Sequence, residues 1–111
     1  MDEEDTVTRF MAAVEELLQI APAGLQPTGA ALIVAVHIGL GSDSRSLSNK
    51  LGIAHALVLR EIGVLSGTLL HIVRRQARTQ RTFVELTAKA KALASTASNA
   101  LKASSLSSET S

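Results

Sequence analysis

The chain has 111 residues, of which 46% are apolar, with no Trp, Tyr or Cys and only two Phe. We expect one small domain with an aliphatic core, and the lack of Cys excludes disulfides, thiolate metal sites and cysteine catalysis. The acidic start MDEEDTVTRF lacks the positive region of a signal peptide, and the longest apolar run, Gly29 to Leu40, is shorter than the roughly 20 residues of a membrane span. A cytoplasmic protein with no membrane contact is therefore expected.

The formal net charge of +1 conceals a strong asymmetry along the chain. Residues 1–43 carry a net charge of −6, whereas residues 44–111 carry +7. Such a split is typical of an anion-binding half joined to a half that does not bind anions. The alternative is that the charges cluster on a solvated surface without a partner.

Apolar residues recur at helical spacing between Val7 and Leu18, which predicts an amphipathic helix ending near Ile20. Asp5 or Thr6 is the expected cap of this helix.

A second helix is expected from Pro27 to about Leu40. It is apolar nearly all round, so it should form the buried centre of the domain. His37 lies in this run and is interpreted as a core or edge histidine, because His37, His55 and His71 show no metal-ligand spacing. No metal and no other cofactor is expected.

The stretch from Ser44 to Leu86 predicts two short helices followed by a basic hairpin. Ser44 can cap a helix from Arg45 to Leu51, Gly52 permits a left-handed bend, and a second helix runs from about Ala54 to Leu65. Alternating apolar residues near 70–73 and 83–86 predict two strands, with the polar loop RRQARTQR between them.

These elements predict a mainly α fold with a small β-hairpin wing: a winged helix-turn-helix flanked by N- and C-terminal helices, which the family resemblance described next implies are dimerisation helices. The helix-turn-helix covers about 44–65 and the wing about 69–86, within a single domain at 1–103. A final helix is expected to begin at Thr87. The Ser-rich residues 104–111 have little apolar content and are expected to form a disordered tail.

From about Gln26 to Ser95 the chain resembles the multiple-antibiotic-resistance regulator (MarR) family of winged-helix transcription factors. The resemblance lies in SLSNKLGIAHALVLREIGVL, for the helix pair, and in RRQARTQRTFVELTAKAKAL, for the wing and its exit. It implies a homodimeric DNA-binding regulator whose terminal helices pair between subunits. Each subunit would place a recognition helix in a major groove and a wing near a minor groove. The chain is shorter than typical members, which argues against the family's small-molecule effector pocket without excluding an effector.

Carried over residue by residue, the resemblance assigns a set of positions to the double-stranded DNA interface. These are Arg45, Ala54, His55, Ala56, Leu59 and Arg60 in the helix pair, and Arg74, Arg75, Arg78 and Arg81 in the wing. Arg45 would face phosphate, and Arg81 matches the wing-tip arginine of the family. The family usually has an Asp two residues before that arginine, but Thr79 stands there, which predicts a less rigid wing tip. With few base-reading side chains on the helix, binding should be dominated by phosphate contacts.

Two other function classes compete with DNA binding. Leu57, Leu59 and Val64 cannot all point into a small core, and an exposed apolar patch on this helix would suit a partner protein, as in an anti-regulator or an adaptor. An enzyme is not expected, because the sequence shows no nucleophile motif, phosphate-binding glycine loop or paired catalytic carboxylates.

Overall fold

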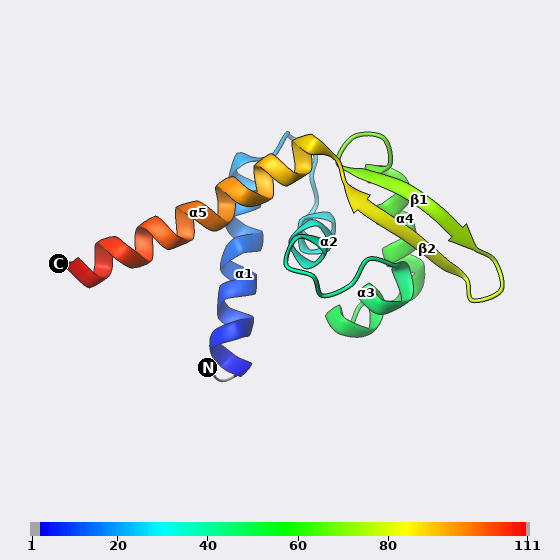
Figure 1. Ribbon diagram of the computed structural model, residues 1–111, viewed down its shortest axis with the longest axis horizontal. Helices are drawn as coiled ribbons and strands as arrows, with labels where there is room; N and C mark the ends of the chain where they lie inside the picture. Colours follow the sequence, from blue (N-terminus) through cyan, green and yellow to red (C-terminus); the bar gives the residue numbers. More distant parts are fainter. Residues whose placement is uncertain (1–2, 111) are drawn as a thin grey trace.

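The structure, a computed structural model, describes the backbone of residues 3–110 and the side chains of residues 6–100. The elements are α1 (Glu3–Ile20), α2 (Pro27–His37), α3 (Ser44–Leu51), α4 (His55–Leu65), β1 (Leu70–Gln76), β2 (Arg81–Leu86) and α5 (Ala88–Thr110). In Figure 1, α1 and α5 occupy one end of the molecule, the β1–β2 hairpin projects from the other, and α2 lies between them. This is a winged helix-turn-helix, as the sequence predicts.

Helix α2 forms the centre of the core. Ala30, Leu32, Ile33 and Ala35 are fully buried within it, because the helix is covered on all sides by other elements. The helix ends at His37 and not near Leu40, since Gly39 takes a left-handed conformation with φ of +82° just beyond it. His37 is consequently exposed at the edge of the core.

Helices α1 and α5 pack against each other beside α2. Ala90, Ala94 and Ala97 make one buried face of α5, and their small side chains let the helices approach closely. Helix α1 begins at Glu3, so the expected caps lie inside it. Helix α5 continues to Thr110, where the composition predicts a tail without structure over 104–111. Once a helix is nucleated, each added residue is gained at little cost, which favours this extension. Residue 111 lies outside the described residues.

The turn between α3 and α4 depends on Gly52. This residue ends α3 with φ of +66° and ψ of 32°, the left-handed conformation expected for it. The Ser48 hydroxyl donates to the Ile53 carbonyl at 2.6 Å and satisfies a backbone acceptor within the turn. Leu47 of α3 and Val58 of α4 are both fully buried, which fixes the angle between the two helices.

The hairpin spans the predicted range, but its strands are longer and its turn is shorter than the sequence suggests. Arginines at both ends of the expected loop belong to the strands, and only residues 77–80 form the turn. The register shifts between Ile72 and Arg74, so that Val73 forms a bulge in β1. The other edge of β2 pairs with the segment before α3, where the Val84 N–H donates to the Ser42 carbonyl at 2.8 Å. The start of the helix pair is thereby joined to the wing.

Candidate nucleic-acid interface

Helix α4 has a buried face and an exposed face at regular spacing. Val58, Ile62 and Leu65 are buried, so at 100° per residue Ala56 and Arg60 lie on the opposite side, and both are exposed. Of the recognition-helix positions predicted from the sequence, Ala56 and Arg60 lie on this outer face.

Two flanks border this outer face. Leu59 lies on one flank, and Leu57 and Val64 lie on the other, with exposed fractions of 38%, 48% and 63%. The expectation that these three residues do not all enter the core is confirmed.

Glu61 is turned away from the outer face of α4. Its carboxylate oxygen Oε1 lies 3.1 Å from the position that a Cβ would occupy on Gly29 of α2. Gly29 is buried, so the absence of a side chain there makes room for the carboxylate and for the close approach of the two helices. The negative charge that would oppose DNA therefore points toward α2.

Asp43 caps α3 and holds the base of the wing. Its carboxylate accepts hydrogen bonds from the Ser46 N–H at 3.0 Å and the Ser46 hydroxyl at 2.8 Å. It also pairs with Arg81, whose Nη1 lies 2.6 Å from Oδ2. Burial by itself raises the pKa of the Asp43 carboxyl, but the Ser46 hydrogen bonds and the Arg81 guanidinium outweigh burial and leave this pKa below its ordinary value.

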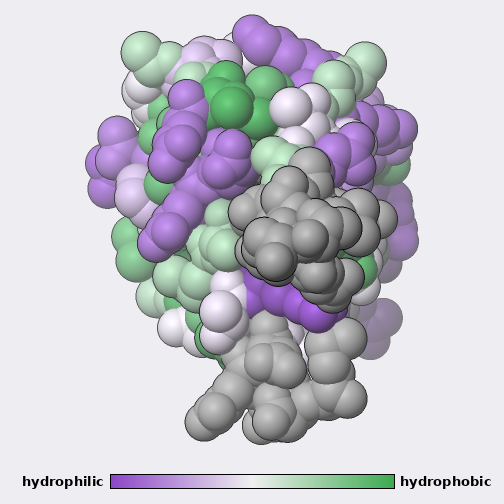
Figure 2. Space-filling model, turned by 90° about the vertical axis from the view of Figure 1, so that its left-hand side faces the viewer, coloured by the Kyte–Doolittle hydropathy of each residue, from purple (hydrophilic) through white to green (hydrophobic). Residues whose placement is uncertain are grey.

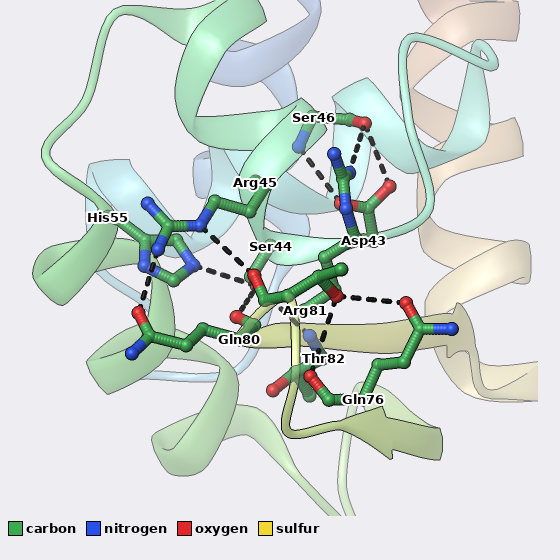
Figure 3. A network of polar contacts seen from close by, with 10 residues as sticks. Asp43, Ser44, Arg45, Ser46, His55, Gln76, Gln80, Arg81 and Thr82 are labelled. Atoms are coloured by element: carbon green, nitrogen blue, oxygen red, sulfur yellow. Dashed lines mark hydrogen bonds and ion pairs between the residues drawn. The ribbon is translucent and has the colours of Figure 1, made fainter.

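Because Asp43 is the cap, the Ser44 hydroxyl is free for another role (Figure 3). Ser44 is fully buried. Its hydroxyl oxygen accepts from the Thr82 N–H at 3.0 Å, lies 3.4 Å from the Gln80 carbonyl and lies 2.9 Å from Nε2 of His55. One side chain at the start of α3 thus contacts both the first residue of α4 and the strand β2.

The environment of His55 favours its neutral form. Burial removes part of the water around the His55 imidazole and lowers its pKa, and the positive charge of Arg45 lowers this pKa further. The Asp43 carboxylate raises the same pKa, but to a smaller extent. A neutral imidazole adds no charge to the surface at pH 7. His55 is therefore better described as a tether between α4 and Ser44 than as a phosphate-binding group.

Arg45 lies against the turn of the wing. Its guanidinium donates from Nη2 to Oε1 of Gln80 at 2.7 Å and from Nε to the Thr79 carbonyl at 3.5 Å. Gln80 has a left-handed backbone with φ of 56°, and no other non-glycine residue in the described part of the chain has a positive φ. The contacts of Arg45 stabilise this turn, so α3 supports the wing tip. The sequence predicts a less rigid wing tip, because Thr79 stands at the position where the family usually has an Asp.

Some arginine side chains of this surface have a partner within the protein, and others have none. Arg81 and Arg45 have the partners above, and the Cζ of Arg74 lies 4.1 Å from the ring centroid of Phe83 in a cation–π contact. Within residues 6–100, the side chains of Arg60, Arg75 and Arg78 have no hydrogen-bond or ion-pair partner and are exposed. These last side chains can bind phosphate without breaking an internal contact.

The structure thus brings the predicted residues together in two groups. Ala54, Ala56, Leu59 and Arg60 are exposed at the start and on the outer side of α4, whereas Arg45, His55 and Arg81 meet around Ser44 and the wing. Asp43, Gln80 and Thr82 also contribute to this surface, although no contact is predicted for them from the sequence. The spacing Asp43-x-x-Ser46 at the start of a helix is a capping signal that could have identified Asp43. Nothing local marks the long-range contact between Ser44 and Thr82.

A groove of about 480 Å³ lies beside α4. Leu57, Arg60, Glu61 and Val64 line it on one side, and the α1–α2 connection and the first turn of α2 line it on the other. Among the residues described, no cluster of three His, Asp or Glu side chains has the geometry of a metal site. Nor does any helix in the described part of the chain have the length and apolar character to cross a membrane.

Solved structures with a similar fold include two variants of ZitR from Lactococcus lactis. A single-substitution variant matches with a TM-score of 0.58 and 18% sequence identity, over 98% of this chain and 82% of the ZitR chain. A double-substitution variant in the apo form matches with a TM-score of 0.57 and 20% identity, over 98% and 80% of the two chains. The likeness establishes the fold. No protein-family model matches the sequence, and no curated protein matches it at a significant level.

Proposed function

We propose that this protein is a DNA-binding transcriptional regulator of the MarR type, not an enzyme. Helix α4 would enter a major groove, and the wing would lie along the phosphate backbone beside it. The observation that carries the proposal is the contact of the Ser44 hydroxyl with both His55 of α4 and Thr82 of β2. This contact presents the outer face of the helix and the arginine-bearing hairpin as one surface.

The charges around this surface support the same conclusion. Arg60, Arg75 and Arg78 are exposed and unpaired within the described side chains, while Glu61 is turned toward α2 and Asp43 is neutralised by Arg81. A surface with several free cations and compensated acids suits an anionic duplex. Most of the affinity should come from phosphate contacts, since Arg60 is the one long side chain on the outer face of α4 that can hydrogen-bond to bases.

The proposal includes a cytoplasmic homodimer formed through α1 and α5. Val7 and Met11 are 59% and 51% exposed and lie one turn apart on α1. Figure 2 shows apolar surface interspersed with polar surface at the end of the molecule that contains α1 and α5. A second copy would cover this apolar area and place two recognition helices on one duplex.

Duplex binding as a function of salt tests the proposed function. We expect wild-type protein to retard a random-sequence duplex at about 50 mM salt and to lose about 10³-fold or more in affinity by about 200 mM. In the proposed dimer the double variant Arg75→Ala/Arg78→Ala removes four phosphate contacts, so it should reduce the slope of log K against log salt by about 3.6, because each contact contributes about 0.9. The measurement is fluorescence anisotropy with a labelled duplex.

Lys89→Ala/Lys91→Ala is the matched control, because it removes two exposed positive charges from α5 instead of the wing. It should leave the salt slope within about 0.5 of the wild type. Absence of binding by wild-type protein at low salt would refute the DNA-binding proposal. Equal losses in both double variants would refute the role of the wing.

The groove beside α4 favours a second candidate function, a protein-interaction module such as an anti-regulator or an adaptor. Leu57 and Val64 expose apolar surface next to Gly24, Gln26 and Thr28. In that case the wild type would not bind DNA at low salt. A partner protein would be retained by Arg75→Ala/Arg78→Ala and lost on Leu57→Glu.

A further inference from the structure

The outer face of α4 has an unusual chemistry for a DNA-reading helix. Arg60 is its long hydrogen-bonding side chain, and the exposed residues around it, Ala54, Ala56 and Leu59, are apolar. Base recognition in the major groove uses either hydrogen bonds to base edges or apolar contact with the 5-methyl group of thymine. The second kind of contact is the one that most of this face can make.

The position of Leu59 relative to the wing selects it from the exposed leucines. His55 reaches Ser44 and through it β2, and Leu59 lies one turn further along the same flank of α4. A duplex in contact with both α4 and the wing passes over this flank. Leu57 and Val64 lie on the opposite flank, where they line the groove beside the α1–α2 connection.

The charges near Leu59 favour DNA over an apolar protein segment as the occupant. Arg60 follows Leu59 directly, and Arg45 lies close to His55 on the same side of the molecule. The acids of this region are compensated or turned away, since Asp43 pairs with Arg81 and Glu61 lies against Gly29. An apolar side chain with arginines on both sides is complementary to a thymine methyl group with phosphates on both sides.

We propose that Leu59, together with Ala56, is a specificity-determining residue that contacts thymine 5-methyl groups in the major groove. The protein therefore prefers thymine-containing sites, and Arg60 contacts either a guanine or a phosphate beside them. The inference rests on the proposed function, because it concerns how the same surface discriminates between DNA sequences.

Deoxyuridine provides a direct test, because it differs from thymidine in a duplex by the 5-methyl group alone. Binding is measured for a duplex of about 20 A·T base pairs and for the same duplex with every thymine replaced by uracil. We expect uracil to weaken binding about threefold to fivefold for each contacted methyl group, which corresponds to one buried methyl-sized group. A G·C duplex with 5-methylcytosine should bind more tightly than the unmethylated G·C duplex, since the methyl group occupies the equivalent position.

Two leucine variants assign the effect to a residue. Leu59→Ala should remove most of the difference between the thymine and uracil duplexes, whereas Leu57→Ala, an identical change on the opposite flank, should preserve it. Both side chains are exposed, so both variants should fold, which thermal unfolding checks.

The outcomes separate the inference from the function on which it rests. Equal affinity of the wild type for thymine and uracil duplexes overturns the inference but leaves DNA binding intact. Loss of discrimination in Leu57→Ala but not in Leu59→Ala overturns the assignment to Leu59. Absence of binding to any duplex at about 50 mM salt overturns the proposed function and the inference with it.

Discussion

At the scale of single residues, Asp43 combines two roles that the sequence would assign to different positions. It caps α3 through Ser46, and it binds Arg81 at the start of β2. Charge-assisted hydrogen bonds of this kind are stronger than neutral ones, and a cap alone contributes about 0.5–2 kcal/mol. The loss of Asp43 should therefore affect both the helix and the wing.

Asp43→Ala is expected to lower the free energy of unfolding by about 2–3 kcal/mol, from the lost cap and the lost partner of Arg81. The pKa of Asp43 is lowered on folding, so its contribution is fully present above the unfolded value of about 3.9 and is lost as the pH falls through the folded pKa. The difference between wild type and variant in urea unfolding should consequently be large at pH 6 and shrink below pH ~3.9. Glu85→Ala, which removes an exposed acid from β2, is the control and should change stability by less than about 0.5 kcal/mol. A difference independent of pH would contradict the ionic part of the role.

The full roles of Asp43, Ser44 and Arg81 could not be predicted from the sequence alone. Ser44 is a good capping residue, so the sequence favours it as the cap of α3, yet Asp43 takes that position and Ser44 turns to the wing. Two adjacent residues can satisfy one local rule, and a contact 38 residues away decides between them. Likewise, Arg81 resembles a free wing-tip arginine in the sequence, but its carboxylate partner lies far back in the chain.

At the scale of secondary-structure elements, the two glycines near α4 make opposite contributions. Gly52 ends α3 with a left-handed backbone, which side chains other than glycine adopt at a cost of about 1–2 kcal/mol. Gly63 lies inside α4, exposed and with open space around its Cβ position. A glycine in a helix interior destabilises it by about 0.5–1 kcal/mol relative to alanine.

Gly52→Ala should therefore lower the free energy of unfolding by about 1–2 kcal/mol, and Gly63→Ala should raise it by about 0.5–1 kcal/mol. Both variants add one methyl group, so each serves as the control for the other in chemical denaturation. Equal effects of the same sign would show that α3 and α4 do not meet in the described turn.

Most elements were predictable from the sequence because their signals are local. The apolar periodicity of α1, the Pro at the start of α2 and Gly52 each mark a boundary without reference to the rest of the chain. The strand ends were not predictable, since polar residues such as Arg74, Gln76 and Arg81 join the hairpin only through pairing across it. The outer side of α4 was predictable in outline, because exposed leucines were expected there, but the flank that faces the wing is known only from the contact between His55 and Ser44.

At the scale of the whole molecule, the wing and the proposed dimer surface lie at opposite ends (Figure 1). DNA contact and subunit pairing would thus use separate surfaces, joined by the buried helix α2. Substitutions on the exposed side of α1 should change association without altering the fold of the wing.

Val7→Glu/Met11→Glu is expected to convert a homodimer into a monomer, because it places two charges on an apolar surface that the second copy would cover. Analytical ultracentrifugation should show a dimer for the wild type. Leu57→Glu, which places a charge on exposed apolar surface of α4, should leave the dimer intact. A monomeric wild type at high concentration, or loss of the dimer in the control alone, would contradict pairing through α1.

The pairing of residues 42–43 with β2 has a further consequence for self-association of strands. One edge of β2 is covered by β1, and the other is engaged by the Ser42 carbonyl and the Ser44 hydroxyl. Within the described residues, the outer edge of β1 is paired at Leu70 with Ser66 and Gly67, and the rest of that edge is interrupted by a bulge and bordered by exposed arginines. Such features prevent edge-to-edge addition of strands from other molecules. The contacts that position the wing therefore also remove one edge of the hairpin from pairing with strands of other molecules.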